Sequence, residues 1–147
     1  MDIKFYDTLP LEAVEIRKLV FVEEQGFKNE FDEIDIYASH LVMFKSNVPI
    51  ATCRFFKKQH ISCYVIGRIA VIKEYRGQKL GAELIKKAEE IVCKNGGKYI
   101  MLHAQIQAQH FYEKQGYLPY GEIEYDENCP HIWMSKKIMG KEDAILE

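Results

Sequence analysis

The sequence predicts an α/β (α+β) domain built on a mixed, mostly antiparallel sheet flanked by helices. Three observations support this prediction. Residues 63–71 form a dense run of β-branched and aromatic residues, which is typical of a central strand buried on both faces. Residues 79–94 carry apolar side chains at helical spacing, with charged side chains on the other face. Shorter apolar runs and turns complete the order β-α-β-β-β-α-β-α-β-β, with one central strand–helix–strand unit.

Length and composition indicate one domain over residues 1–147. The chain is 48% hydrophobic and 29% charged, with a formal net charge of −2, which is ordinary for a globular protein. The small net charge gives no electrostatic reason to expect nucleic acid or a membrane surface as a partner. Acidic residues interrupt the N-terminal segment, and no apolar run approaches the roughly 18 residues that span a membrane. A cytoplasmic location is therefore expected.

The N-terminal part is expected to hold a strand and a helix. Residues 3–6 form a short candidate strand. Thr8 can cap a helix that begins after Pro10 and ends near Gly26, because apolar residues recur between them at an approximately helical spacing. Residues 27–37 are acidic and aromatic without a clear period, so we expect a loop with one short helix.

The remaining elements follow from turn residues that bound short apolar runs. Residues 40–44 and 50–56 are predicted to form a β-hairpin around a turn at 46–49. After the long helix, residues 95–97 contain two glycines that end it. Further along the chain we expect a strand at 99–103, a short helix at 107–114 that Gly116 ends, and a last strand at 132–135.

The turn between the central strand and the long helix is the first candidate site. The first turn of a helix has backbone N–H groups without intrahelical partners, and the helix dipole favours an anion there. Gly77 and Gly81 remove side chains where backbone would approach the anion, while Arg76 and Lys79 add positive charge. Taken alone, the same residues would also fit a surface turn with solvated basic side chains.

Two segments resemble the GNAT superfamily of acetyltransferases. Residues 69–81 (IAVIKEYRGQKLG) resemble its acetyl-CoA signature, with Arg76 and Gly81 at the first and last positions and Lys79 where the family most often has glycine. Residues 108–117 (AQHFYEKQGY) resemble a second family segment, with Tyr117 in place of phenylalanine. Residues 21–26 (FVEEQG) and the surrounding sequence resemble the ElaA/YjcF branch.

This resemblance implies the acyl-CoA N-acyltransferase fold, with a splayed pair of central strands, and a set of donor-binding residues. Backbone N–H groups of the strand before the loop would bind the pantetheine arm of acetyl-CoA, and the loop would bind its pyrophosphate. The residues implicated in binding acetyl-CoA are Ile69, Ala70, Val71, Arg76, Gly77, Gln78, Lys79, Leu80, Gly81, Ala82 and Tyr112.

Tyr112 is the strongest catalytic candidate. By resemblance, its hydroxyl lies near the sulfur of CoA and acts as the general acid. A phenol with a pKa of about 10 is protonated at neutral pH and can donate to a thiolate whose pKa is about 8.5. The alternative is an aromatic core residue with a hydrogen-bonded tip.

The base and the acceptor site are less defined by the sequence. Glu33 and His131 are candidates for the base, and Arg68 is excluded because a guanidinium stays protonated. Glu24, Asp32, Asp35 and His103 are candidates for binding a cationic acceptor. For each acid the alternative is a solvated surface charge, and for the histidines a structural role.

The function predicted from these features is transfer of an acetyl group from acetyl-CoA to a primary amine, by direct attack in a ternary complex. The acceptor would be a small-molecule or protein amine, and a homodimer is possible. An acyl-CoA-binding sensor without efficient transferase activity is the main alternative, and a plain α/β interaction domain is a third. No metal is expected, since the nearest pair of ligands, Cys129 and His131, lacks partners at zinc-site spacing.

Overall fold

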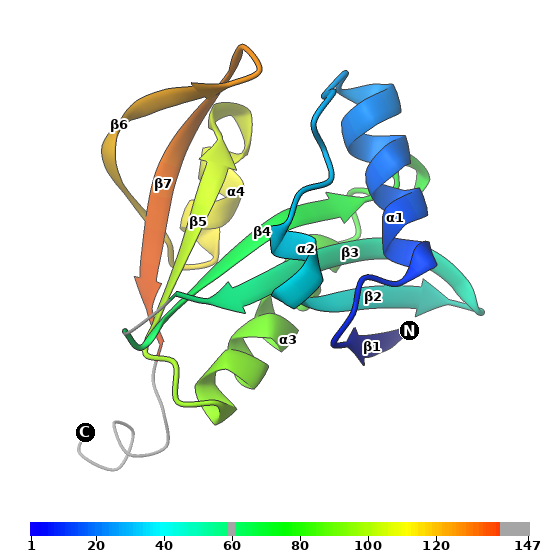
Figure 1. The fold of residues 1–147 in the computed structure, drawn as a ribbon, viewed down its shortest axis with the longest axis horizontal. Coiled ribbons are helices and arrows are strands. Elements are labelled where there is room, and N and C mark those ends of the chain that lie inside the picture. The colour runs from blue at the N-terminus through cyan, green and yellow to red at the C-terminus, as the bar shows by residue number, and fades with distance from the viewer. Residues whose placement is uncertain (59–60, 139–147) are drawn as a thin grey trace. The chain divides into compact units, whose positions relative to one another are not determined.

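The structure, a computed structural model, describes residues 1–58 and 61–138. Within this part, seven strands are hydrogen-bonded in the order β1-β2-β3-β4-β5-β7-β6 (Figure 1). The pairs β1–β2, β2–β3, β5–β7 and β6–β7 are antiparallel, and β4–β5 is parallel. The predicted mixed, mostly antiparallel sheet is therefore confirmed.

The strands are β1 (Asp2–Tyr6), β2 (Ser39–Lys45), β3 (Val48–Lys57), β4 (Cys63–Val71), β5 (Tyr99–Gln105), β6 (Leu118–Asp126) and β7 (Cys129–Lys137). The α-helices are α1 (Leu11–Arg17), α2 (Ile34–Tyr37), α3 (Leu80–Lys94) and α4 (Gln109–Lys114). A π-helix, η1 (Lys18–Glu24), continues α1, and two short 3-10 turns are η2 (Lys73–Tyr75) and η3 (Ile106–Ala108).

The chain forms two compact units, and three elements contribute to both: β3 with its last residue, β4 and α3. Among the described residues, the first unit comprises 1–56 and 66–88, and the second comprises 57–58, 61–65 and 89–138. Strand β4 passes from the second unit into the first after Val65, and α3 passes back after Ala88. Neither unit is therefore a continuous stretch of sequence.

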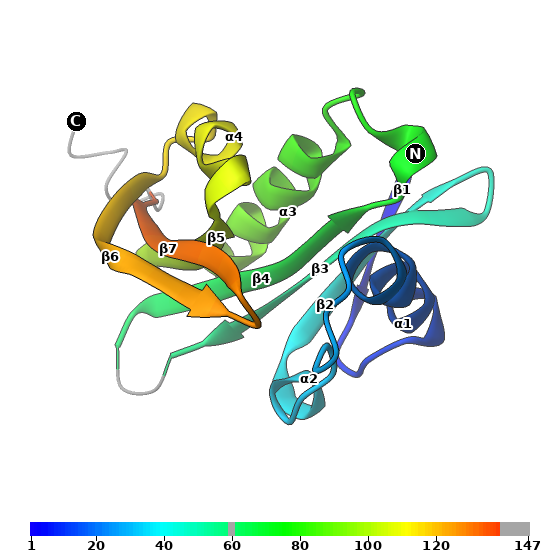
Figure 2. The same cartoon turned by 90° about the horizontal axis from the view of Figure 1, so that it is seen from above.

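The first unit has helices on both sides of its strands. Figure 2 shows α1 and α2 on one side of β2 and β3, and the first half of α3 on the other. On the α1 side, Ile16 and Phe21 belong to a buried cluster with Val42, Phe44 and Ala70. Because Val42 and Phe44 are two residues apart on β2, they face the same side of the sheet. This packing fixes α1 and η1 on the strands that lead to the candidate loop.

The start of α1 differs from the prediction. The residue that caps it is Pro10, in an extended conformation, and the backbone N–H groups of Ala13 and Val14 donate to the Pro10 carbonyl. No side chain caps this helix, so the proposed cap by Thr8 is wrong. Proline can precede a helix without a capping side chain because its fixed φ already suits helix entry.

The β2–β3 hairpin is tighter than predicted. Ser46 and Asn47 both have left-handed backbone conformations, with φ of 50° and 67°. Two successive residues of this kind make a turn whose twist matches that of a hairpin. Strand β3 therefore already begins at Val48, within the stretch predicted as turn.

Strand β4 has the predicted bounds and the central place in the strand order. Its burial is only partly as predicted, because Cys63, Ile66 and Ala70 are buried while the other residues are half-buried. Its ladder with β5 joins residues 63–65 to residues 99–101 and lies within the second unit. Only the first three of the nine residues of β4 pair with β5, so the ladder between the two strands ends at Val65. This agrees with the expected splayed pair of central strands.

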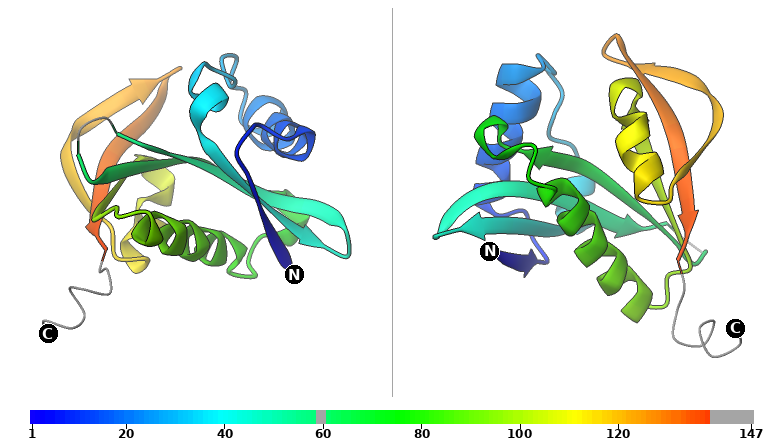
Figure 3. Two further views of the ribbon diagram at one scale, coloured as in Figure 1. Left: turned by 60° about the horizontal axis from the view of Figure 1, so that its bottom comes forward. Right: turned by 180° about the vertical axis from the view of Figure 1, so that it is seen from behind.

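The second unit is organised around β5, β7 and β6. Figure 3 shows β6 and β7 as a long antiparallel pair, and α4 packs against β5 and β6. Every residue of β6 is exposed, so the alternation of polar and apolar residues at 122–126 (EIEYD) does not mark a buried face. Gly97 follows α3 where an added Cβ would clash with the side chains of Val92 and Tyr64.

Three further observations concern residues 1–58 and 61–138. All four cysteines are free thiols. No group of three or more His, Cys, Asp or Glu side chains lies close enough to hold a metal ion. No helix here combines the length and the apolar character needed to cross a membrane.

Candidate functional site

The candidate loop lies between the end of β4 and the start of α3, as predicted. The N–H of Ile72 donates to the Ile50 carbonyl at 2.9 Å, which ties the end of β4 to β3. The turn η2 follows, and then four residues, 76–79, lead into α3. Gly77 has φ of +82° and Lys79 has φ of +62°. Two left-handed residues in so short a segment reverse the chain and place the first turn of α3 directly after the loop.

The loop exposes the residues expected to bind the anion. Gly77, Gln78 and Lys79 are exposed, Leu80 is buried, and Gly81 and Ala82 are half-buried. Space is open around Gly77, where an added Cβ would meet no atom within 4 Å. Leu80 therefore anchors the helix start in the core while the loop before it stays accessible, which suits a helix N-terminus that receives a phosphate.

Lys79 adopts a backbone conformation that favours glycine. A left-handed conformation costs an L-residue about 1–2 kcal/mol, and glycine avoids this cost. We expect Lys79→Gly to raise the free energy of unfolding by about 1 kcal/mol in urea denaturation. Lys79→Ala, which removes the charge and keeps the Cβ, is the control and should not stabilise the protein. Equal effects of the two changes would contradict strain at this position.

Arg76 forms a bidentate ion pair with Glu24 in the first unit. Its Nη1 and Nη2 atoms each lie 2.6 Å from a carboxylate oxygen of Glu24, and its Nε donates to the Val71 carbonyl at 2.9 Å. The hydrogen bond from Arg76 lowers the pKa of Glu24. Glu24, which the sequence suggested for acceptor binding, is thus in contact with the loop residue Arg76.

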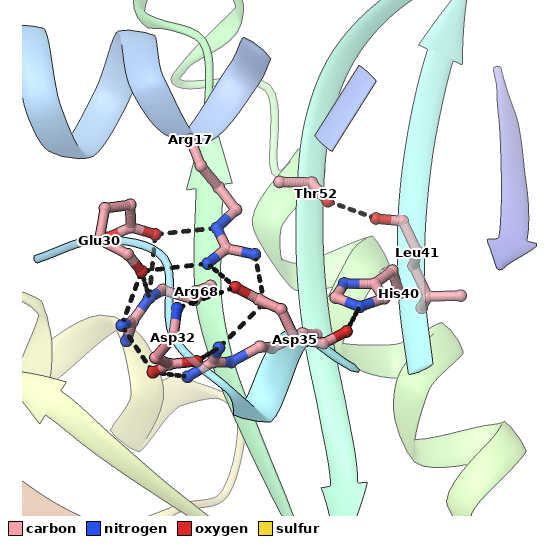
Figure 4. Close-up of polar contacts among 9 residues, drawn as sticks. Arg17, Glu30, Asp32, Asp35, His40, Leu41, Thr52 and Arg68 are labelled. Carbon is pink, nitrogen blue, oxygen red and sulfur yellow. Dashed lines mark hydrogen bonds and ion pairs between the residues drawn. The ribbon is translucent and has the colours of Figure 1, made fainter. Parts of the chain in front are cut away.

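Arg17 is the centre of a buried ionic network that the sequence analysis missed (Figure 4). Its side chain is 1% exposed. Its Nε lies 2.8 Å from Glu30 Oε2, and its Nη1 lies 2.7 Å from Asp35 Oδ1. The guanidinium also lies over the Phe31 ring, 4.7 Å from the centroid. Arg17 follows the buried Ala13 by four residues on the helix, so a charge on the apolar helical face was the available signal for a buried partner.

Two further arginines complete this network. Arg54 Nη1 lies 2.6 Å from Asp32 Oδ1 and 3.0 Å from Asp35 Oδ1. Arg68 Nε lies 2.9 Å from Glu30 Oε2, and its Nη2 lies 3.3 Å from Asp32 Oδ2. Arg68 has φ of 49° within β4. The network therefore joins three guanidinium groups to three carboxylates and connects segment 30–35 to α1, β3 and β4.

The ionic network bears on whether the acids of residues 30–35 can bind a cationic acceptor. Asp35 is buried, and Asp32 makes a two-point contact with Arg54. Carboxylates paired in this way have little remaining charge for a cationic acceptor. Glu33 lies at the start of α2 with an exposed side chain. The ion pairs support a structural role for Asp32 and Asp35, whereas Glu33 takes no part in the network of Arg17, Arg54 and Arg68 described above.

The pKa values of the three carboxylates shift in different directions, although burial acts to raise all of them. Burial raises the pKa of Glu30, against the opposing effects of Arg68, Arg17 and Arg54. For Asp35, burial also acts to raise the pKa, but the hydrogen bonds and charges of Arg17 and Arg54 outweigh it and lower the pKa to about 2. The pKa of Asp32 is lowered as well. The two aspartates thus favour the folded state when they are ionised.

These pKa shifts predict a loss of stability in acid. A group with a lowered folded pKa stabilises above its unfolded pKa, near 3.8 for Asp35, and this stability disappears as the pH falls towards 2. We expect the Asp35 contribution lost across this window to be about 2 kcal/mol. Ionisation of Glu30 has the opposite effect on stability, because its folded pKa is raised above 4.5. This effect develops as the pH rises above 4.5, so it lies outside the acid range in which the Asp35 contribution is lost.

Urea denaturation between pH 5 and 2 measures this effect. Asp35→Asn should lower stability at pH 5 and should flatten the dependence on pH below 4. An unchanged slope in this variant would show that Asp35 does not cause the acid sensitivity.

The second unit holds Tyr112 and its supporting contacts. Tyr112 is half-buried on α4, with its ring centroid 5.1 Å from that of Phe111 and 6.5 Å from that of Tyr117. The buried Tyr117 donates its hydroxyl hydrogen to Glu89 Oε2 at 2.8 Å, and Lys136 Nζ lies 3.1 Å from the same oxygen. The N–H of Tyr117 also donates to the Tyr112 carbonyl at 3.1 Å. These contacts fix the end of α4 that follows Tyr112.

The two candidate histidines lie together in the second unit. The His103 ring stacks on Trp133, with centroids 4.5 Å apart, and lies 4.8 Å from the His131 ring. Burial and the neighbouring His131 lower the pKa of His103. His131 is buried, and its Nδ1 lies 2.9 Å from the Cys129 carbonyl. A carbonyl only accepts, so this contact is a hydrogen bond in the tautomer that carries its proton on Nδ1.

Comparison with known proteins agrees with the predicted family. Residues 7–138 match the family described as "Acetyltransferase (GNAT) domain". A Bacillus subtilis protein named as a suspected acetyltransferase is 39% identical over 130 residues, covering 85% of this chain and 87% of that protein. YjcF of B. subtilis, named as an uncharacterized N-acetyltransferase, is 32% identical (85% and 90% covered), and ElaA of Escherichia coli is 30% identical (86% of each).

Solved structures show the same fold. The crystal structure of E. coli ElaA is similar with a TM-score of 0.81 and 28% identity, covering 92% of this chain and all of that one. An aminoglycoside 6'-N-acetyltransferase in complex with coenzyme A has a TM-score of 0.76 at 18% identity, covering 96% and 99%. The chain therefore belongs to the GNAT acetyltransferase superfamily, in the branch that includes ElaA and YjcF.

Proposed function

We propose that this protein is an acetyl-CoA-dependent N-acetyltransferase that acts on a primary amine. One observation carries the proposal. The strand–turn–helix at residues 71–81 directs the N-terminus of the 15-residue helix α3 to an exposed loop with two left-handed residues. Such a helix end favours a phosphate group through its N–H groups and its dipole. The aminoglycoside enzyme of the same fold binds coenzyme A, which supports the pyrophosphate of CoA as this anion.

On the donor side, residues 76–82 would hold the pyrophosphate, and the backbone of residues 69–71 would bind the pantetheine arm. Ile69 and Val71 are half-buried and Ala70 is buried. Lys79 would add a positive charge beside the phosphates. Leu80 would hold the helix start in place from the core side.

In the proposed reaction, the neutral amine attacks the thioester carbonyl carbon, and the carbon–sulfur bond then breaks. Tyr112 would protonate the departing thiolate of CoA. The proton lost by the amine would pass to His131, whose Nε2 is the acceptor in the tautomer that carries its proton on Nδ1. Glu33 is the other candidate base because its carboxylate is exposed. No covalent enzyme intermediate is required, since donor and acceptor would be bound together.

On the acceptor side, the ion pairs of Glu24, Asp32 and Asp35 with arginines disfavour these acids as ligands of a cationic acceptor. His103 remains a candidate for contacting the acceptor, together with Trp133, on which it stacks. Glu124, 3.6 Å from His103, is a further acid near these rings. An amine that carries positive charge would suit this combination of aromatic and acidic side chains.

The second candidate is an acyl-CoA-binding sensor. The observation in its favour is that the acids of segment 30–35 that could have served an acceptor are largely paired with arginines. Both candidates require the loop to bind CoA, and they differ in whether an acceptor amine reacts.

Isothermal calorimetry with acetyl-CoA tests the donor half of the proposal. The wild-type protein should bind, and Gly81→Leu should bind more weakly because its side chain would occupy the helix end where the phosphate approaches. Equal affinities for the two proteins would contradict the loop assignment, and no binding by the wild type would contradict the proposed function.

A further inference from the structure

All three nitrogen atoms of the Arg76 guanidinium have a hydrogen-bond partner, two of them in the ion pair with Glu24. Nε, Nη1 and Nη2 each make a contact of 2.9 Å or less, with the Val71 carbonyl and the two oxygens of Glu24. A two-point contact with parallel N–H···O bonds is the strongest geometry for this pair and fixes the orientation of both side chains. The side chains are 39% and 35% exposed, so the pair lies at the surface beside the loop.

Glu24 reaches this position from the end of a π-helix. The N–H of Gln25 donates to the Val20 carbonyl, five residues earlier, at 3.2 Å. This wider turn keeps Val20 and Phe21 in the core, while Glu24 at the next turn faces Arg76, 52 residues further along the chain. π-Helical segments are rare and occur often at functional sites.

The segment that carries Glu24 is held firmly at its other end. Arg17, the residue before the π-helix, is fixed by Glu30 and Asp35. Burial of Val20 and Phe21 holds the middle of the segment. Glu24 is therefore presented to Arg76 from a rigid support rather than from a free side chain at a loop tip.

We propose that Glu24 is a positioning residue for the loop that binds CoA. By holding Arg76 against the Val71 carbonyl, it fixes residues 76–79 at the end of β4, so that the N–H groups at the start of α3 are already arranged for the pyrophosphate. Arg76 then acts mainly as a brace for the loop and less as a phosphate ligand. This inference rests on the proposed function, because it needs the loop to bind CoA.

The direction in which removal of the Glu24 carboxylate changes the affinity for acetyl-CoA distinguishes a positioning role from a purely electrostatic one. If only charge mattered, a carboxylate beside an anion site would repel the phosphates, and removing it would strengthen binding. If Glu24 positions the loop, removing it weakens binding, because some of the binding free energy is then spent on ordering the loop. The two explanations thus predict opposite changes in the affinity for acetyl-CoA.

The test is calorimetry with acetyl-CoA on the wild type, Glu24→Gln and the matched control Glu23→Gln. Glu23 is the neighbouring exposed acid, so its replacement removes the same charge without touching Arg76. We expect Glu24→Gln to weaken binding about fivefold and Glu23→Gln to leave it unchanged or slightly stronger. Unchanged or stronger binding by Glu24→Gln would overturn the inference.

Two further measurements use the same variants. With a reacting amine, Glu24→Gln should raise KM for acetyl-CoA while kcat stays near the wild-type value. With S-acetylpantetheine, a donor without the pyrophosphate, the variant and the wild type should have equal kcat/KM. An equal loss with both donors would assign Glu24 a general structural role and overturn the inference. If the wild type does not bind acetyl-CoA, the proposed function itself is contradicted, and with it the basis of the inference about Glu24.

Discussion

Replacing Arg17 by methionine should lower the free energy of unfolding by about 3–5 kcal/mol, which is the cost of removing one partner from a buried ion pair. Arg17 is 1% exposed and contacts the carboxylates of Glu30 and Asp35, both of which are also buried. Methionine fills a similar volume, so the loss would come from the buried charges that remain and less from a cavity. Urea denaturation at neutral pH measures the change.

The control is the adjacent residue. Lys18 is exposed, and Lys18→Met should change stability by no more than about 0.5 kcal/mol. A loss below about 1 kcal/mol for Arg17→Met would show that the carboxylates find other partners or take up protons without penalty.

Replacing Tyr112 by phenylalanine should lower kcat by about 10²–10⁴, the usual contribution of general acid catalysis. The substitution removes only the hydroxyl, so the affinity for acetyl-CoA should stay close to that of the wild type. Steady-state kinetics that follow CoA release, together with calorimetry, separate the two quantities.

Tyr99→Phe makes the same chemical change at an exposed position of β5 and should leave kcat unchanged. If Tyr112→Phe also retains the wild-type kcat, Tyr112 is not the acid, and another group must protonate the thiolate. A loss of affinity without a loss of kcat would assign Tyr112 to donor binding.

Much of the fold could be predicted because local sequence specifies its central elements. The bounds of β4 were predicted correctly from its dense β-branched run, and α3 begins one residue later than expected. The bounds of strand β6 were not predicted: residues 122–126 (EIEYD) alternate between polar and apolar, but the strand buries neither face. The π-helix after Arg17 was not predicted either, since it depends on how Val20 and Phe21 pack against the sheet.

The candidate site likewise has a part that local sequence specifies and a part that depends on contacts between distant residues. The loop at residues 76–81 is continuous in sequence, so its strand–turn–helix setting could be predicted and the structure confirms it. The partners of Glu24 and Asp35 lie 52 and up to 19 residues away, and only the folded chain brings them together. The acids therefore looked available for an acceptor, whereas Arg76, Arg17 and Arg54 neutralise them.

A screen of diverse primary amines with acetyl-CoA tests the central claim most directly. The measurement is CoA release, with mass spectrometry of the acetylated amine. The proposed function predicts at least one amine whose acetylation depends on the protein and falls sharply in Tyr112→Phe. Binding of acetyl-CoA without transfer to any amine in a broad set, including polyamines, amino sugars and peptide amines, would contradict it and favour an acyl-CoA sensor.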